Sequence, residues 1–223
     1  SDNIKRCGTV DKPRSLDGSY FWDGERGFVW NWTAEAKAQW FEDPKAKRWS
    51  EDEKADWLAK RRAAHKRVEQ GYQQAAVKAV QIISACKQGN HPYLERKGFP
   101  DEQTLVDANG AMVIPMRNMQ GSIQSLQFIS WNPEISKFEK KMLPGGKAGG
   151  GMLILGSKSA SEYCLVEGYA TALSVYAAAR SVGLRLSVVT CFSASNLENI
   201  ARIMPGKLII FADNDRHKTN QGE

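Results

Sequence analysis

The chain has 223 residues, which is enough for one large domain or two smaller ones with a substantial core. Hydrophobic residues make up 42% and charged residues 25%, and no apolar run approaches the roughly 18–20 residues that span a bilayer. The first ten residues contain no signal-peptide apolar segment, so we expect a cytoplasmic protein with no membrane partner. The net charge of +6 is compatible with a polyanionic partner but does not require one.

The cysteines and histidines do not have the spacing of a zinc site. No two cysteines form a CxxC pair, and the three histidines form no HxxxH pattern. Because a structural zinc site needs closely spaced ligands, we expect no zinc. Reduced and mostly buried thiols are the better interpretation of the four cysteines, Cys7, Cys86, Cys164 and Cys191.

Residues 1–90 are interpreted as an N-terminal region made of an aromatic β element and a long helix. Up to residue 32, aromatic stretches broken by Asp-Gly pairs predict short antiparallel strands with tight turns. From residue 33 onwards the pattern is helical, and Ser50 followed by Glu53 matches a capping box. A stripe of apolar residues recurs at helical spacing, and Gly89-Asn90 is expected to end the helix.

The remainder of the chain, residues 91–223, predicts an α/β fold. Two apolar segments, 111–116 and 122–130, form a hairpin pattern, and a glycine-rich loop follows at 143–151. Beyond that loop, predicted strands and helices alternate, which favours a parallel sheet. The predicted strands are 163–166, 187–190 and 207–212, and the helices between them are 170–179 and 196–203.

Three carboxylates follow predicted strands of this sheet. Glu167 comes directly after one strand, and Asp213 and Asp215 come after another. Functional groups gather at the carboxyl ends of parallel strands, and converging carboxylates repel one another unless a cation neutralises them. Oxygen ligands of this kind suit Mg²⁺, which stabilises the attacking and leaving oxygens of a phosphoryl transfer. A plainer interpretation is that these acidic residues only cap helices or begin turns.

The order strand-Glu-Gly, helix, strand, helix, strand-Asp-x-Asp resembles the Toprim domain of bacterial-type primases, topoisomerases and some nucleases. The matching segments are 165–169 (LVEGY) and 211–215 (FADND). The resemblance implies that Glu167 is the general acid/base of nucleotidyl transfer. It also implies that Asp213 and Asp215, together with Glu167, surround a catalytic Mg²⁺ or Mn²⁺. Residues 157–223 would then be a Toprim domain that is incomplete at its C-terminus, because the family's fold continues with a further helix and strand.

Residues 91–156 resemble the small β-rich subdomain that precedes the Toprim domain in primases. The phrase Glu167-Gly168-Tyr169-Ala170-Thr171 is similar to that of conjugative-plasmid and phage primases that lack a zinc finger. In chromosomal primases the position of Thr171 is usually an aspartate, so one metal ion would be held more weakly here. The resemblance places a set of nucleic-acid or nucleotide contacts at Arg117, Lys140, Lys141, Lys147, Ser193 and Asn196. Solvated loop lysines and a helix cap at Ser193 remain open as alternatives.

The function implied by this resemblance is primer synthesis for phage or plasmid replication. The partners would be a single-stranded DNA template, nucleoside triphosphates and a replicative helicase, either fused or separate. Two other functions stay open: a metal-dependent Toprim nuclease, and a non-catalytic module that binds single-stranded nucleic acid. Incubation with template, Mg²⁺ and labelled triphosphates separates them, since the products are primers, shortened template or a bound complex alone.

Overall fold

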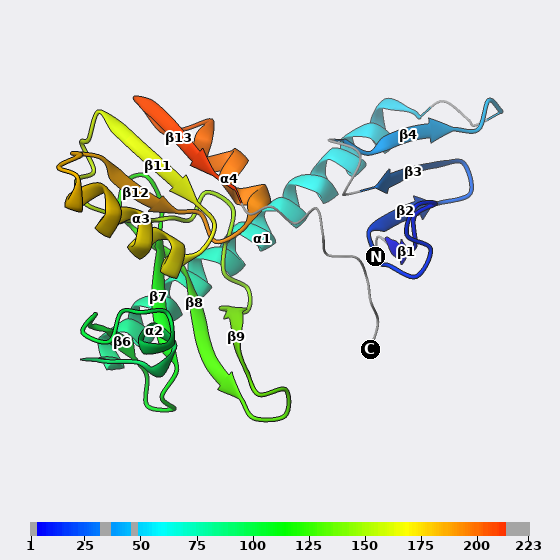
Figure 1. Cartoon of the computed structure of the whole chain (residues 1–223). Helices are drawn as coiled ribbons and strands as arrows, with labels where there is room; N and C mark the ends of the chain where they lie inside the picture. The colour runs from blue at the N-terminus through cyan, green and yellow to red at the C-terminus, as the bar shows by residue number, and fades with distance from the viewer. Residues whose placement is uncertain (1–3, 32–36, 46–48, 213–223) are drawn as a thin grey trace. The chain divides into compact units, whose positions relative to one another are not determined.

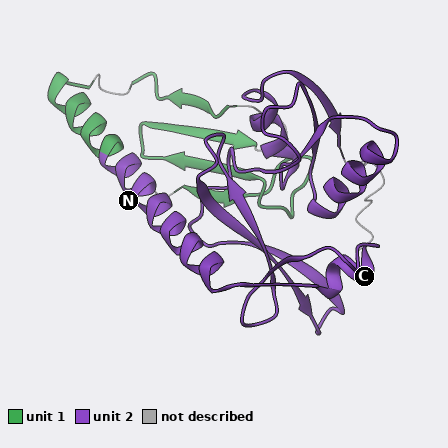
Figure 2. Cartoon of the chain, turned by 90° about the vertical axis from the view of Figure 1, so that its left-hand side faces the viewer, with its two compact units in different colours: residues 1–62 green, residues 63–223 purple. Residues whose placement is uncertain are grey.

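The computed structural model describes residues 4–31, 37–45 and 49–212. The chain divides into two compact units, residues 1–62 and 63–223, and the boundary falls inside a long helix (Figure 2). The division into three regions made from sequence stays a prediction. Within the described residues, every helix is too short or too polar to cross a membrane.

The first unit contains a four-stranded antiparallel sheet in the order β1-β2-β3-β4. The predicted aromatic strands are therefore confirmed, and the turn between β2 and β3 is held by Asp23, whose Oδ1 accepts hydrogen bonds from the backbone N–H groups of Glu25 and Arg26. These bonds lower the pKa of the Asp23 carboxyl. The strands are β1 (Lys5–Cys7), β2 (Gly18–Trp22), β3 (Arg26–Asn31) and β4 (Gln39–Glu42). The helical prediction for 33–90 is wrong at β4, whose backbone pairs with β3.

Helix α1 (Glu51–Ala85) begins at the predicted capping box. The Ser50 backbone N–H donates to Glu53 Oε2 at 2.7 Å, and the Glu53 N–H donates to Ser50 Oγ at 3.2 Å. The predicted end at Gly89-Asn90 is wrong, because Lys87–Gly89 leaves the helix and pairs as β5 with β6 (Thr104–Val106). A sheet pairing therefore ends this helix earlier than the glycine signal indicates.

A five-stranded antiparallel sheet, in the order β5-β6-β7-β8-β9, forms the first half of the second unit. The predicted hairpin is confirmed as β7 (Met112–Arg117) and β8 (Ile123–Asn132), and β9 (Lys137–Met142) pairs on the far side of β8. Alternate residues point to opposite faces. One face packs Val113 and Leu126 with α1, and the other packs Met112, Ile114 and Ile129 with the short helix α2 (Pro92–Arg96).

The second half is a four-stranded sheet in the order β10-β12-β11-β13. Strands β11, β12 and β13 are labelled in Figure 1. The predicted alternation of strands and helices is confirmed, and β11, β12 and β13 are parallel. The elements are β10 (Leu153–Leu155), β11 (Glu162–Val166), α3 (Tyr169–Ser181), β12 (Ser187–Thr190), α4 (Ala194–Ala201) and β13 (Lys207–Phe211). β10 adds an antiparallel edge strand. The fold is thus a mixed α/β fold.

Helices α3 and α4 cover opposite faces of this sheet. Cys164, Val166 and Val188 pack with Ala172 of α3, whereas Tyr163, Leu165 and Val189 pack with Leu197 and Ile200 of α4. All four cysteines are free, and Cys164 and Cys191 are buried while Cys7 and Cys86 are half-buried. The prediction of mostly buried thiols is thus confirmed for Cys164 and Cys191, and the other two are only half-buried.

The internal strand β11 and the edge strand β13 of the C-terminal sheet differ in their contribution to stability. Leu165 is completely buried on β11, whereas its register partner on β13, Ile210, is 51% exposed. We expect Leu165→Ala to lower the free energy of unfolding by about 2–5 kcal/mol. The matched variant Ile210→Ala should lower it by about 1 kcal/mol or less. Urea unfolding followed by circular dichroism measures both, and equal losses would contradict the packing described here.

Candidate active site

Glu167 lies at the carboxyl edge of the C-terminal sheet. It directly follows β11, whose last residue, Val166, is paired in parallel register with Phe211 at the end of β13. The Glu167 carbonyl accepts a hydrogen bond from the Phe192 N–H at 2.8 Å, so the turn after β11 is tied to the turn after β12. The side chain is half-buried, and within the described residues its carboxylate forms no hydrogen bond or ion pair. It is therefore available to a proton or a cation.

The other two predicted carboxylates, Asp213 and Asp215, lie outside the described residues. Strand β13 ends at Phe211, and the described part of the chain ends at Ala212, one residue before Asp213 in the sequence. Among the residues up to Ala212 that the structure describes, no three His, Cys, Asp or Glu side chains come together as a metal site would require. The predicted three-carboxylate group stays a prediction.

The structure separates the two neighbouring lysines of β9. A Cβ placed on Gly168 would lie 3.7 Å from Lys140 Nζ, so this ammonium group lies beside the turn that carries Glu167. Lys141 is the next residue along the strand and so points to the opposite face, where it forms a 2.8 Å ion pair with Glu139. The hydrogen bond to Glu139 raises the pKa of Lys141. Of these two lysines, Lys140 is the one that adds positive charge next to Glu167.

Two side chains hold the glycine-rich loop. Gln124 of β8 donates from Nε2 to the carbonyls of Lys147 and Gly149, at 2.8 Å and 3.1 Å. The second is the buried Asn196 of α4. Its Oδ1 accepts a hydrogen bond from the Gly150 N–H at 2.7 Å. Its Nδ2 donates to the carbonyls of Gly151 and Cys191, at 2.8 Å and 2.7 Å. Because the amide is fully used by these bonds, we expect Asn196 to position the loop and not to contact a ligand directly.

Three further predicted residues make local contacts. Ser193 is the N-cap of α4, and its Oγ accepts a hydrogen bond from the Asn196 N–H. The alternative prediction of a helix cap at Ser193 is therefore confirmed. Arg117 Nη1 donates to the Gly121 carbonyl at 2.8 Å. Lys147 Nζ lies 5.8 Å from the centre of the Tyr72 ring. None of these contacts places Ser193, Arg117 or Lys147 beside Glu167.

A strained residue that the sequence does not signal adjoins Glu167. Phe192 has a φ of 69°, in the left-handed region that side chains other than glycine seldom adopt. Such a conformation costs about 1–3 kcal/mol and is found most often at functional sites. The neighbouring Cys191 thiol is not a nucleophile here, because burial raises its pKa to about 12.

A row of aromatic rings and cations also ends near Glu167. Arg96 stacks over Trp131 at 4.4 Å, Trp131 meets the Phe138 ring edge-on at 5.2 Å, and Phe138 meets Tyr93 at 5.4 Å. Lys140 Nζ lies 5.9 Å from the centre of the Tyr93 ring and completes the row. Trp131 is 41% exposed and is therefore not a buried core residue. The sequence shows Trp131 and Arg96 individually, but residues 97–130 lie between them, and the fold brings them together.

Removal of the Asn196 amide tests its role as an anchor of the loop. Asn196→Ala leaves the Gly150 N–H without its partner, and we expect a loss of about 2–4 kcal/mol in the free energy of unfolding. Limited proteolysis should then cut within residues 144–151 faster than in the unchanged protein. Asn199→Ala, at an exposed position on the same helix, is the control and should change neither measurement. If proteolysis of the loop is equally slow in both variants, Asn196 does not anchor the loop.

Comparison with known proteins does not identify the function of this site. No protein-family model and no curated protein matches the chain. The residues that define the site are a half-buried glutamate at the edge of a parallel sheet, a lysine beside it, and a glycine-rich loop held by an asparagine and a glutamine.

Proposed function

We propose that this chain is part of a Toprim-type primase that synthesises short RNA primers on single-stranded DNA with the help of a divalent metal ion. The observation that carries the proposal is the direct parallel pairing of β11 with β13, in which Val166 is the register partner of Phe211. Glu167 follows the first strand at once, and Asp213 is two residues beyond the second. Neighbouring parallel strands deliver the residues that follow them to one edge of the sheet.

In this proposal Glu167 acts as the general base that accepts the proton of the attacking hydroxyl group. Its carboxylate suits that role, because it is half-buried and forms no hydrogen bond or ion pair with any described residue. Asp213 and Asp215 would hold Mg²⁺ or Mn²⁺, together with Glu167. The chemistry that such an ion supplies is neutralisation of phosphate charge and stabilisation of the attacking and leaving oxygens.

The row from Trp131 to Lys140 supports a role in holding a single-stranded template. Of its three rings, Trp131 is exposed, Phe138 is half-buried and Tyr93 is buried, so a base would stack on Trp131 while the adjacent cations contact the phosphates. Trp131 and Arg96 form the outer end of the row, and Lys140 forms the inner end beside Gly168. A strand lying along this row would have its backbone directed toward Glu167.

Thr171 distinguishes this chain from the chromosomal primases that it resembles. Its Oγ1 would lie 3.6 Å from a Cβ placed on Gly168, so the hydroxyl group is close to the Glu167 turn. A hydroxyl group brings no negative charge, which reduces the attraction for a second cation. We therefore propose a site with one strongly held metal ion, and primer synthesis that requires a high Mg²⁺ concentration.

Primer synthesis on a single-stranded template with labelled triphosphates tests the proposal. Glu167→Gln and Asp213→Asn should each reduce synthesis by about 10²–10⁴-fold, because the proton acceptor or a metal ligand is lost. Affinity for the template should remain unchanged or rise, since a repelling charge is removed.

Glu162→Gln is the matched control, because Glu162 lies at the other end of β11 and pairs with Lys207 at 2.9 Å. It should leave synthesis unchanged. Template shortened by the unchanged protein would indicate a nuclease instead, and template bound without any product would indicate a binding module. Full synthesis by Glu167→Gln would overturn the assignment of the general base.

The neighbouring lysines Lys140 and Lys141 of β9 provide a second test, by fluorescence measurement of DNA affinity at several salt concentrations. Lys140→Ala should weaken binding and reduce the slope of log K against log salt by about 1, because one phosphate contact is lost. Lys141→Ala should leave the slope nearly unchanged, since that ammonium group is already paired with Glu139. A slope in Lys140→Ala equal to that of the unchanged protein would show that Lys140 contacts no phosphate.

A further inference from the structure

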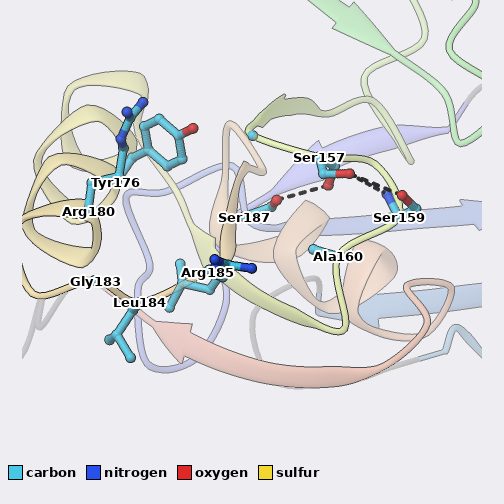
Figure 3. Close-up of a pocket in the computed structure, with 11 residues that line it drawn as sticks. Ser157, Ser159, Ala160, Tyr176, Arg180, Gly183, Leu184, Arg185 and Ser187 are labelled. Carbon is cyan, nitrogen blue, oxygen red and sulfur yellow. Dashed lines mark hydrogen bonds between the residues drawn. The ribbon is translucent and has the colours of Figure 1, made fainter.

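A pocket of about 410 Å³ opens at the amino-terminal edge of the C-terminal sheet (Figure 3). It is formed by the loop after β10, the last turns of α3 and the loop that leads into β12. The polar and aromatic side chains that line it are Ser157, Ser159, Tyr176, Arg180, Arg185 and Ser187. Small-molecule sites in proteins occupy roughly 300–1,000 Å³, so the pocket is large enough for a compact ligand.

This pocket is separate from the candidate active site. Strand β12 begins with Ser187, which lines the pocket, and ends with Thr190, which is paired with Val166 next to Glu167. Because β11 and β12 are parallel, the pocket and Glu167 lie at opposite ends of the same strands. At about 3.3 Å per residue, the strands keep the two sites roughly 10 Å or more apart.

The pocket has a positive charge that no acidic residue balances. No aspartate or glutamate lines it, and within the described residues neither Arg180 nor Arg185 forms an ion pair. Arg180 lies in the last turn of α3, where a cation stabilises the exposed carbonyls of the helix, and its guanidinium stacks on Tyr176 at 5.7 Å. Arg185 lies beyond the end of α3, so its charge does not stabilise the helix carbonyls in this way. Guanidinium groups bind phosphate oxygens through two parallel hydrogen bonds.

The serine side of the pocket is already ordered by internal contacts. The buried Ser187 Oγ donates a hydrogen bond to the Ser157 carbonyl at 2.8 Å, and Ser157 Oγ accepts one from the Ser159 N–H at 3.2 Å. Gly156 has a φ of 100°, and a Cβ on it would lie only 2.7 Å from Ser187 Oγ. Glycine is therefore required at this position, and the loop presents two exposed hydroxyl groups in a fixed arrangement.

We propose that this pocket binds a nucleoside monophosphate, or a phosphorylated ligand of the same size and shape. Arg185 and the hydroxyl groups of Ser157 and Ser159 hold the phosphate, and Arg180 adds a second positive charge. The face of the Tyr176 ring that Arg180 does not cover provides the apolar surface on which the base lies. This inference does not rest on the primase proposal, because none of its residues belongs to the Glu167 edge.

Calorimetric titration of the whole chain with AMP, adenosine and inorganic phosphate tests this assignment. AMP should bind saturably with one site per chain, and phosphate and adenosine should each bind at least tenfold more weakly. Arg185→Gln should raise the Kd for AMP at least tenfold, and Arg180→Gln should raise it by a smaller factor. Arg202→Gln is the matched control, because Arg202 is an exposed arginine that pairs with Glu198 on α4, and it should leave the Kd within twofold.

Several results would overturn the proposal. Absence of saturable AMP binding, or an unchanged Kd in Arg185→Gln, would remove the site, provided that circular dichroism shows the variant to be folded. Phosphate that binds as tightly as AMP would exclude a contribution from the base. Glu167→Gln should retain AMP binding, so a loss there and not in Arg185→Gln would place the nucleotide at the opposite edge. Primer synthesis by these variants reports separately on the primase proposal.

Discussion

The parallel pairing of β11 with β13 is the constraint on which the candidate active site depends. Both strands are short, and their register aligns Val166 with Phe211, so the chain leaves the two strands at the same level of the sheet. Packing on both faces maintains this register, with α3 against Cys164 and Val166 and α4 against Leu165. A shift of one residue would exchange these faces and bury the wrong side chains. The register therefore ties the position of Glu167 to the packing of the whole C-terminal sheet.

A second constraint joins the antiparallel sheet to the C-terminal sheet. Tyr169 and Leu173 of α3 share one apolar cluster with Met112 and Ile129 of the five-stranded sheet and with Tyr93 of α2. Tyr169 is the first residue of α3, two positions after Glu167, so this cluster holds the glutamate turn against β9. Burial in the cluster raises the pKa of Tyr169 to about 12, which leaves its hydroxyl group neutral at physiological pH. The proximity of Lys140 to Gly168 follows from this packing.

The two edges of the C-terminal sheet differ in chemical character. The carboxyl edge combines a carboxylate without a described partner, a strained Phe192 and a glycine-rich loop anchored by Asn196. The amino edge combines two arginines with a loop of serines ordered around Gly156. Helix α3 runs from one edge to the other, from Tyr169 beside Glu167 to Arg180 in the pocket. A ligand at one edge therefore contacts the same helix that carries the turn at the other.

Local patterns in the sequence were sufficient for most of the secondary structure. The capping box at Ser50 and Glu53, the hairpin around Gly121 and the alternation of strands and helices after residue 160 depend on neighbouring residues, and each is present in the structure. The same patterns indicated Glu167 as a strand-terminal carboxylate. The end of α1 and the existence of β4 were decided by pairing with other strands, which no local pattern records. Residues far apart in the chain also form the contact of Lys140 with the Gly168 turn, the hydrogen bonds of Asn196 to the loop and the pocket that contains the two arginines. Only tertiary packing brings such residues together, because side-chain direction and burial are set by whichever element lies opposite.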